Sequence, residues 1–75
     1  MHSSLEDCLS QLSDKQREVV ERRFGLHGYT VSTLEQVGQE IGVTRERVRQ
    51  IQMDALKKLK RILEQEGFSV EALLK

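Results

Sequence analysis

The segment from Leu34 to Ile51 constrains the fold of this chain more than any other stretch. Its spacing suits two short helices that cross steeply around a tight turn. That geometry requires apolar residues where the helices meet, a small residue at the fifth position and a residue tolerant of positive φ at the ninth. The apolar positions hold Leu34, Val37, Ile41, Val43, Val48 and Ile51. The other two positions hold Gly38 and Gly42. An ordinary helical hairpin needs the apolar stripe but neither glycine, so the spacing predicts a helix-turn-helix.

Start and stop signals predict the remaining helices. A Ser or Thr followed three residues later by Glu or Gln forms a capping box that opens a helix. Such pairs are Ser3 with Glu6, Ser13 with Gln16, and Thr33 with Gln36. Thr44 is expected to cap a long recognition helix from Arg45 to about Glu66, and Ser69 a last short helix over 70–74. The expected helix stops are Gly25, Gly42 and Gly67. The helix after Ser13 is expected to place Val19, Val20 and Phe24 on one side.

The composition fits one small all-α domain of about five helices that spans residues 1–75. The chain has no Pro or Trp and is rich in strong helix formers. A single cysteine, Cys8, excludes an intrachain disulfide and fits a reducing compartment. We find neither a signal-peptide pattern nor an apolar stretch near the roughly 20 residues that span a bilayer. We therefore expect a cytoplasmic protein without membrane contact. The chain begins with Met-His-Ser-Ser, so Met1 and His2 are candidates for residues of an expression tag.

The net charge of zero hides an uneven distribution of charge along the chain. The segment 44–61 contains seven basic residues against only Glu46 and Asp54, while the segments on either side are acidic. A local excess of this size is a candidate surface for phosphates. The alternative is a helix face that is merely solvated.

The expected long helix divides into two faces at about 100° per residue. The inward stripe is Val48, Ile51, Ala55, Leu59 and Ile62. The outward row is Glu46, Gln50, Met53, Lys57 and Lys60, flanked by Arg45 and Arg49. In the major groove Arg can bind guanine, Gln can bind adenine and Glu can accept from cytosine, and recognition helices present such residues from their N-terminal end. The sequence therefore predicts base reading by Arg45, Glu46, Arg49 and Gln50, rather than simple solvation of a helix.

The second half of this helix carries a further basic group of less definite role. Its members are Lys57, Lys58, Lys60 and Arg61. They suit either contact with phosphates or docking of another protein. The helix dipole alone also favours basic residues near a C-terminus.

The cysteine and histidine residues of this sequence do not form the pattern of a catalytic or metal site. Cys8 has no general base near it, and a lone helical cysteine is usually a small buried hydrophobe. His2 and His27 cannot complete a zinc site with one cysteine. His27 and Tyr29 lie in an expected loop over 26–32, where exposure to solvent is the default. We expect no enzyme, no metal and no cofactor.

The run TLEQVGQEIGVTRERVRQI over 33–51 closely resembles the C-terminal promoter-recognition region, region 4, of bacterial sigma factors of the housekeeping group. The upstream run KQREVVERRFG over 15–25 resembles the helix that precedes it, and the resemblance extends from about Leu9 to Leu74. Gln52, Asp54 and the tail GFSVEALL over 67–74 place the chain nearest to the stationary-phase (general stress) branch. Such factors carry further domains, so the resemblance implies a longer natural chain.

The resemblance implies a domain that directs RNA polymerase to the promoter −35 element. By position, Arg45, Glu46 and Gln50 match base-reading residues, and Arg49 matches a base or phosphate contact. The positions near the DNA backbone are Lys15, Arg23, Thr33, Leu34 and Arg47. Many members of the group carry a lysine in place of Asp54 and use it to meet activators, so Asp54 departs from that pattern.

Two of these backbone positions can be examined on physical grounds. Free N–H groups at the helix start around Thr33 and Leu34 suit a phosphate. Arg23 is equally suited to pairing with an acid such as Glu18 or Glu40.

The resemblance also implies partners other than DNA. The family docks this region on the flap of the polymerase β subunit, and Leu9, Leu12 and Val20 are candidates to line that site, although most such residues are core. An alternative hypothesis makes the domain chiefly a protein-docking module for the flap, an activator or an anti-sigma factor. Because a small module without net charge offers few base contacts, we expect poor affinity for DNA unless polymerase holds the domain beside the promoter.

Overall fold

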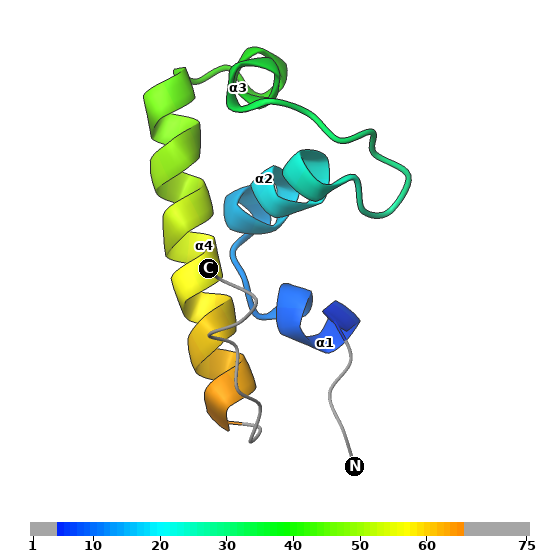
Figure 1. Ribbon diagram of the computed structural model, residues 1–75, viewed down its shortest axis with the longest axis vertical. Coiled ribbons are helices and arrows are strands. Elements are labelled where there is room, and N and C mark those ends of the chain that lie inside the picture. The colour runs from blue at the N-terminus through cyan, green and yellow to red at the C-terminus, as the bar shows by residue number, and fades with distance from the viewer. Residues whose placement is uncertain (1–4, 66–75) are drawn as a thin grey trace.

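A computed structural model describes residues 5–65 of the chain, which form four α-helices (Figure 1). They are α1 (Leu5–Ser10), α2 (Asp14–Phe24), α3 (Leu34–Ile41) and α4 (Arg45–Gln65). The predicted all-α class is confirmed. The expected helix over 70–74, its cap at Ser69, the stop at Gly67, the capping pair of Ser3 with Glu6, and Met1 and His2 fall outside the described residues or depend on residues outside them.

Two of the predicted helix starts, those of α2 and α3, are present as complete capping boxes. At α2, the Gln16 N–H donates to Ser13 Oγ at 3.2 Å, and the Ser13 N–H donates to Gln16 Oε1 at 3.1 Å. At α3, the corresponding distances between Thr33 and Gln36 are 3.1 and 2.9 Å. Each box satisfies backbone donors that a helix start would otherwise leave without a partner.

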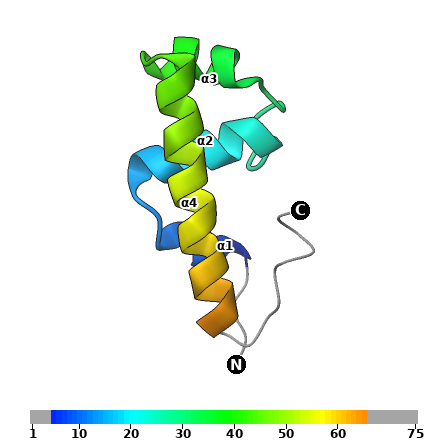
Figure 2. The ribbon, with the colours of Figure 1, turned by 60° about the vertical axis from the view of Figure 1, so that its left-hand side comes forward.

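Helix α4 forms the frame of the molecule, and α1, α2 and α3 all pack against it. Its 21 residues span about 32 Å. Figures 1 and 2 show α3 beside the start of α4, α2 beside its middle and α1 beside its second half. No described helix is both long enough and apolar enough to cross a membrane.

Two apolar clusters lie between α4 and the shorter helices. The upper cluster contains Val19, Val37, Val48 and Ile51, with Leu34, Ile41 and Val43 packed around it. The lower cluster contains Leu9, Leu12, Val20 and Ala55, with Leu26 and Leu59 packed around it. Because Val19 and Val20 are neighbours in sequence, α2 joins the two clusters. The predicted inward stripe of α4 is buried, except that Leu59 is only partly covered.

Phe24 differs in burial from the other two residues expected on that side of α2. Val19 and Val20 are buried, whereas the Phe24 side chain is 48% exposed. Phe24 is the last residue of α2, and Gly25 turns the chain there with a φ of 66°. Helix periodicity assigns a residue to a face but does not determine whether another element covers that face.

The turn between α3 and α4 has the predicted construction. Gly42 adopts a φ of 79°, in the left-handed region, and the N–H groups of Gly42 and Val43 both donate to the Gly38 carbonyl. A Cβ atom on Gly38 would lie only 2.6 Å from the Val43 carbonyl oxygen. The fifth position must therefore be glycine because the turn itself passes over it.

Candidate nucleic-acid interface

Thr44 caps the start of α4, as predicted. The Arg47 N–H donates to Thr44 Oγ1 at 3.1 Å, and the Val48 N–H donates to the Thr44 carbonyl at 3.0 Å. The next turns bury Val48 and Ile51 in the upper cluster. This packing determines which side of α4 faces outward, and that side carries Arg45, Glu46, Arg49 and Gln50, all of them exposed.

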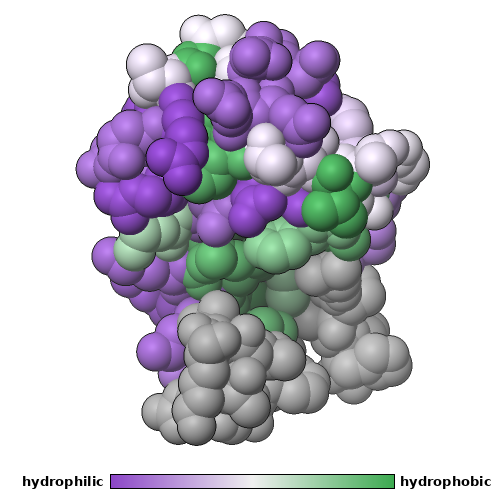
Figure 3. Space-filling view, turned by 45° about the horizontal axis from the view of Figure 1, so that its top comes forward, coloured by the Kyte–Doolittle hydropathy of each residue, from purple (hydrophilic) through white to green (hydrophobic). Residues whose placement is uncertain are grey.

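These four residues share one polar end of the molecule. Figure 3 brings forward the end that contains α3 and the start of α4, and hydrophilic side chains dominate it. The predicted base-reading residues are therefore gathered on one face.

Glu46 and Arg49 are bonded to each other on this face. Arg49 Nη2 lies 2.6 Å from Glu46 Oε2, and Arg49 Nε also donates to both carboxylate oxygens. These hydrogen bonds lower the pKa of Glu46 and raise that of Arg49. Arg49 Nη1 also lies 3.0 Å from the Met53 sulfur. Two of the four candidate readers thus form an ion pair, while Arg45 and Gln50 flank it.

A hollow of about 300 Å³ lies beside this face, between the starts of α3 and α4. Arg23, Thr33, Leu34, Glu35 and Arg45 line it. The N–H groups of Leu34 and Glu35, at the first positions of α3, have no intrahelical acceptor. The expectation for Thr33 is wrong in one respect, because its N–H group already donates to Gln36 as part of the capping box.

Arg23 is fixed at the base of this region by neutral oxygen atoms. Its Nε donates to Gln52 Oε1 at 2.8 Å, and its Nη1 donates to the Ser32 carbonyl at 2.6 Å. Within residues 5–65, the alternative in which Arg23 pairs with an acid such as Glu18 or Glu40 is therefore not observed.

The preceding arginine makes that pairing instead. Arg22 donates to Glu18 at 2.9 Å, lies 3.7 Å from Glu40, and stacks over the Tyr29 ring with 4.6 Å to its centroid. The hydrogen bond with Glu18 raises the pKa of Arg22. Successive helical residues point about 100° apart, so Arg22 and Arg23 reach different neighbours.

The other predicted contact residues lie on the surface without converging on one site. Lys15 is exposed in the first turn of α2, and Arg47 is exposed in the first turn of α4. Of the later residues of α4, Lys60 is half-buried, and the exposed ones are Asp54, Lys57, Lys58 and Arg61. In contrast, Leu9, Leu12 and Val20 are at most 6% exposed, so these residues are core and do not line a docking surface. Cys8 is also buried, as expected.

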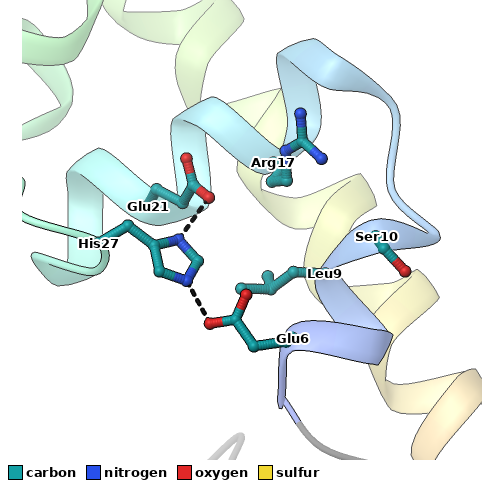
Figure 4. Close-up of a pocket in the computed structure, with 6 residues that line it drawn as sticks. All are labelled: Glu6, Leu9, Ser10, Arg17, Glu21 and His27. Carbon is teal, nitrogen blue, oxygen red and sulfur yellow. Dashed lines mark hydrogen bonds and ion pairs between the residues drawn. The ribbon is translucent and has the colours of Figure 1, made fainter.

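Sequence reasoning missed a bridge made by His27 (Figure 4). Its Nδ1 lies 2.6 Å from Glu21 Oε2 on α2, and its Nε2 contacts Glu6 Oε2 on α1. Both ring nitrogens face carboxylates, an arrangement that requires both to donate and therefore a protonated ring. The hydrogen bonds to Glu6 and then Glu21 raise the pKa of His27. These partners lie 21 and 6 residues away in sequence, so no local signal identifies the bridge.

This bridge predicts a pH-dependent contribution to stability. The pKa of His27 is raised in the folded chain above its ordinary value of 6.5. Its contribution is therefore fully present below pH 6.5 and is lost as the pH rises through the folded-state pKa. We expect the difference in unfolding free energy between the wild type and His27→Gln to be largest in mild acid and to narrow with rising pH. Urea denaturation of both chains across this range measures it. A difference independent of pH, or an NMR-determined pKa at or below 6.5, would contradict the bridge.

Comparison with known proteins agrees with this geometry. Residues 8–61 match the family model described as "Sigma-70, region 4". The chain is also 54% identical over 71 residues to the RNA polymerase sigma factor RpoS of Coxiella burnetii (strain RSA 493 / Nine Mile phase I). That alignment covers 95% of this chain and 20% of the relative, so the chain spans about one fifth of the relative's length. Both findings confirm the resemblance drawn from the sequence.

Proposed function

Because this chain belongs to the region 4 family of sigma-70 factors, we propose that it recognises the −35 element of bacterial promoters as a domain of an RNA polymerase sigma factor and thereby directs transcription initiation. The observation that supports this function most directly is the exposed set at the start of α4. Arg45, Glu46, Arg49 and Gln50 project from its first two turns, while Val48 and Ile51 anchor the opposite side.

The chemistry of these side chains suits the major groove. Arg45 can donate two hydrogen bonds to the O6 and N7 atoms of guanine, and Gln50 can pair with the N6 and N7 atoms of adenine. Glu46 can accept from the N4 amine of cytosine. Arg49 holds the Glu46 carboxylate through its hydrogen bonds at 2.6 to 3.2 Å, and we propose that the two residues enter the groove as a unit.

The hollow between α3 and α4 suits a backbone phosphate at the edge of the groove. Arg23 and Arg45 supply positive charge to the hollow. The first N–H groups of α3 lie at the positive end of its helix dipole and can donate hydrogen bonds to an anion. The Glu35 carboxylate also lines the hollow and partly opposes this charge. We propose that Lys15 and Arg47 contact other phosphates of the DNA backbone.

We propose that productive recognition requires the polymerase core as a second partner. The chain has no net charge, so its long-range attraction to DNA is weak. Tethering through the β-subunit flap supplies the effective concentration that the base contacts alone lack. This role needs no cofactor and no catalytic step, and it places the protein in the bacterial cytoplasm with the nucleoid-bound polymerase.

We predict that NMR titration of the ¹⁵N-labelled chain distinguishes a duplex with a −35-type hexamer from a scrambled duplex. We expect larger shifts with the specific duplex, concentrated at the start of α4. Gln50→Ala is expected to reduce the preference for the specific duplex by at least about fivefold, because one bidentate base contact is worth about 1–3 kcal/mol. Titrations at low and moderate salt give both dissociation constants for each variant.

The matched control is Gln39→Ala, which removes the same amide from an exposed position of α3. Its preference is expected to equal that of the wild type. Equal binding of the two duplexes by the wild type, with shifts that vanish in salt, would show backbone attraction alone and would contradict base reading.

A second candidate function is protein docking by an apolar part of the surface. Phe24, Tyr29 and Val31 are 48%, 36% and 68% exposed, and the loop that contains Tyr29 and Val31 returns over Gly25. Such side chains suit the flap, an activator or an anti-sigma factor. Asp54 and the basic residues Lys57, Lys58, Lys60 and Arg61 offer a charged surface to the same classes of partner. Loss of promoter discrimination with intact polymerase docking in variants of Arg45, Glu46 and Gln50 would exclude docking as the main role.

A further inference from the structure

We propose that Gln52 is a positioning residue that keeps the charge of Arg23 available to DNA, because it holds the guanidinium in place without neutralising it. This inference rests on the proposed function and deepens it. It assigns a role to a side chain that lies outside both the base-reading set and the predicted backbone contacts.

The geometry places Arg23 at the junction of three elements. The residue itself is near the end of α2, Gln52 belongs to α4, and Ser32 lies just before α3. The hydrogen bonds of 2.8 Å to Gln52 and 2.6 Å to Ser32 fix the guanidinium in a half-buried position. Both acceptors are neutral carbonyl-type oxygens.

Other arginines of the chain are held differently. Arg17 lies 3.4 Å from Asp14, Arg22 lies 2.9 Å from Glu18, and Arg49 lies 2.6 Å from Glu46. In each of these pairs a carboxylate cancels the charge of the guanidinium. Arg23 gains comparable fixation from an amide oxygen, so its positive charge is not cancelled by the side chain that anchors it.

This difference matters because Arg23 lines the hollow proposed to seat a phosphate. The charged side chains around that hollow are Arg23, Arg45 and Glu35. Their formal sum is positive by one charge, and a carboxylate at position 52, bonded to Arg23, would bring the local sum to zero. A neutral acceptor at this position is therefore what leaves the hollow attractive to an anion.

The test is Gln52→Glu, which preserves the shape of the side chain and its acceptor oxygen while adding one negative charge. We expect about threefold to tenfold weaker binding to the specific and the scrambled duplex alike, because a phosphate contact carries no sequence information. The slope of log affinity against log salt should fall by about one. The melting temperature should stay equal or rise, because the hydrogen bond becomes charge-assisted.

Two controls separate this effect from a change in overall charge. Gln65→Glu adds the same charge at an exposed position at the far end of α4, and we expect its affinity to stay within about twofold of the wild type. In an Arg23→Gln background, Gln52→Glu should weaken binding by less than about twofold further, because the charge that it neutralises is already absent.

The outcomes separate the inference from the proposed function. The role of Gln52 is overturned if the Gln52→Glu variant binds DNA as tightly as the Gln65→Glu variant. It is also overturned if Gln52→Glu lowers the melting temperature together with the affinity. If the specific duplex is still preferred in that case, the proposed function stands. If the wild type binds both duplexes equally and Gln52→Glu weakens both by the same factor, the result supports the role of Gln52 and overturns promoter reading.

Discussion

Replacing Gly38 with alanine is expected to lower the free energy of unfolding by about 2 kcal/mol, the middle of the range for overpacking a close-packed site. The added Cβ would lie 2.6 Å from the Val43 carbonyl oxygen, which belongs to the backbone of the turn and has no rotamer through which to move away. The turn must therefore shift, and with it the angle at which α4 leaves α3. Urea denaturation followed by helical circular dichroism measures the change.

The sign of this effect makes the test informative. Within a helix, replacing glycine with alanine usually stabilises a protein by roughly 0.5–1 kcal/mol because glycine loses more backbone entropy on folding. Gln39→Ala, at the exposed neighbouring position, serves as the control and is expected to change stability by no more than about 0.5 kcal/mol. A Gly38→Ala chain as stable as the wild type, or more so, would contradict the close approach of the turn.

The second large effect is expected from Leu9→Ala, which should cost about 3 kcal/mol of unfolding free energy. Leu9 is 1% exposed in the lower cluster, where α1 packs with α2 and α4. Removing its side chain leaves a cavity far from the end that carries the candidate base-reading residues. In a domain of this size, the loss corresponds to a fall in melting temperature of roughly 12–24 °C, which calorimetry resolves readily.

This variant also tests whether α1 is an integral part of the domain. Gln11→Ala, at an exposed position just after α1, provides the control and is expected to leave the melting temperature nearly unchanged. At a temperature where Leu9→Ala is still folded, its preference between the two duplexes should match that of the wild type. A cost below about 1 kcal/mol would mean that the lower cluster does not depend on α1.

Several features of the interface could be read from the sequence because they depend on near neighbours. The two capping boxes were predicted and join residues three apart; the pair of Glu46 with Arg49 was not predicted, although it also spans three residues. Such partners are brought together by the helix itself, whatever the rest of the chain does. The exposure of Gln50 opposite the buried Val48 and Ile51 follows from the same periodicity.

Interactions between distant segments were not accessible in this way. Arg23 was expected to contact either a phosphate or an acid, and its observed partner on α4 is 29 residues away. His27 was expected to be exposed, and it is, but its bridge between α1 and α2 was not foreseen. Phe24 was expected on the same side of α2 as Val19 and Val20, but helix periodicity did not show that about half of its side chain stays exposed at the end of α2. In each case the residue type allowed several partners, and the packing of separate helices selected one.

The sequence by itself therefore determined the helices within residues 5–65, the glycine turn between α3 and α4, the face of α4 that carries the candidate base-reading residues, and the family of the chain. These features rest on local spacing, whose geometry the helix repeat sets. Only the tertiary structure decided how the charges are shared among neighbours. It gave Arg22 two carboxylates, Arg23 two neutral oxygens, and His27 a carboxylate on each side. The reason is that a charged side chain pairs with whatever group the folded chain brings within hydrogen-bonding distance, and helix crossings set that distance.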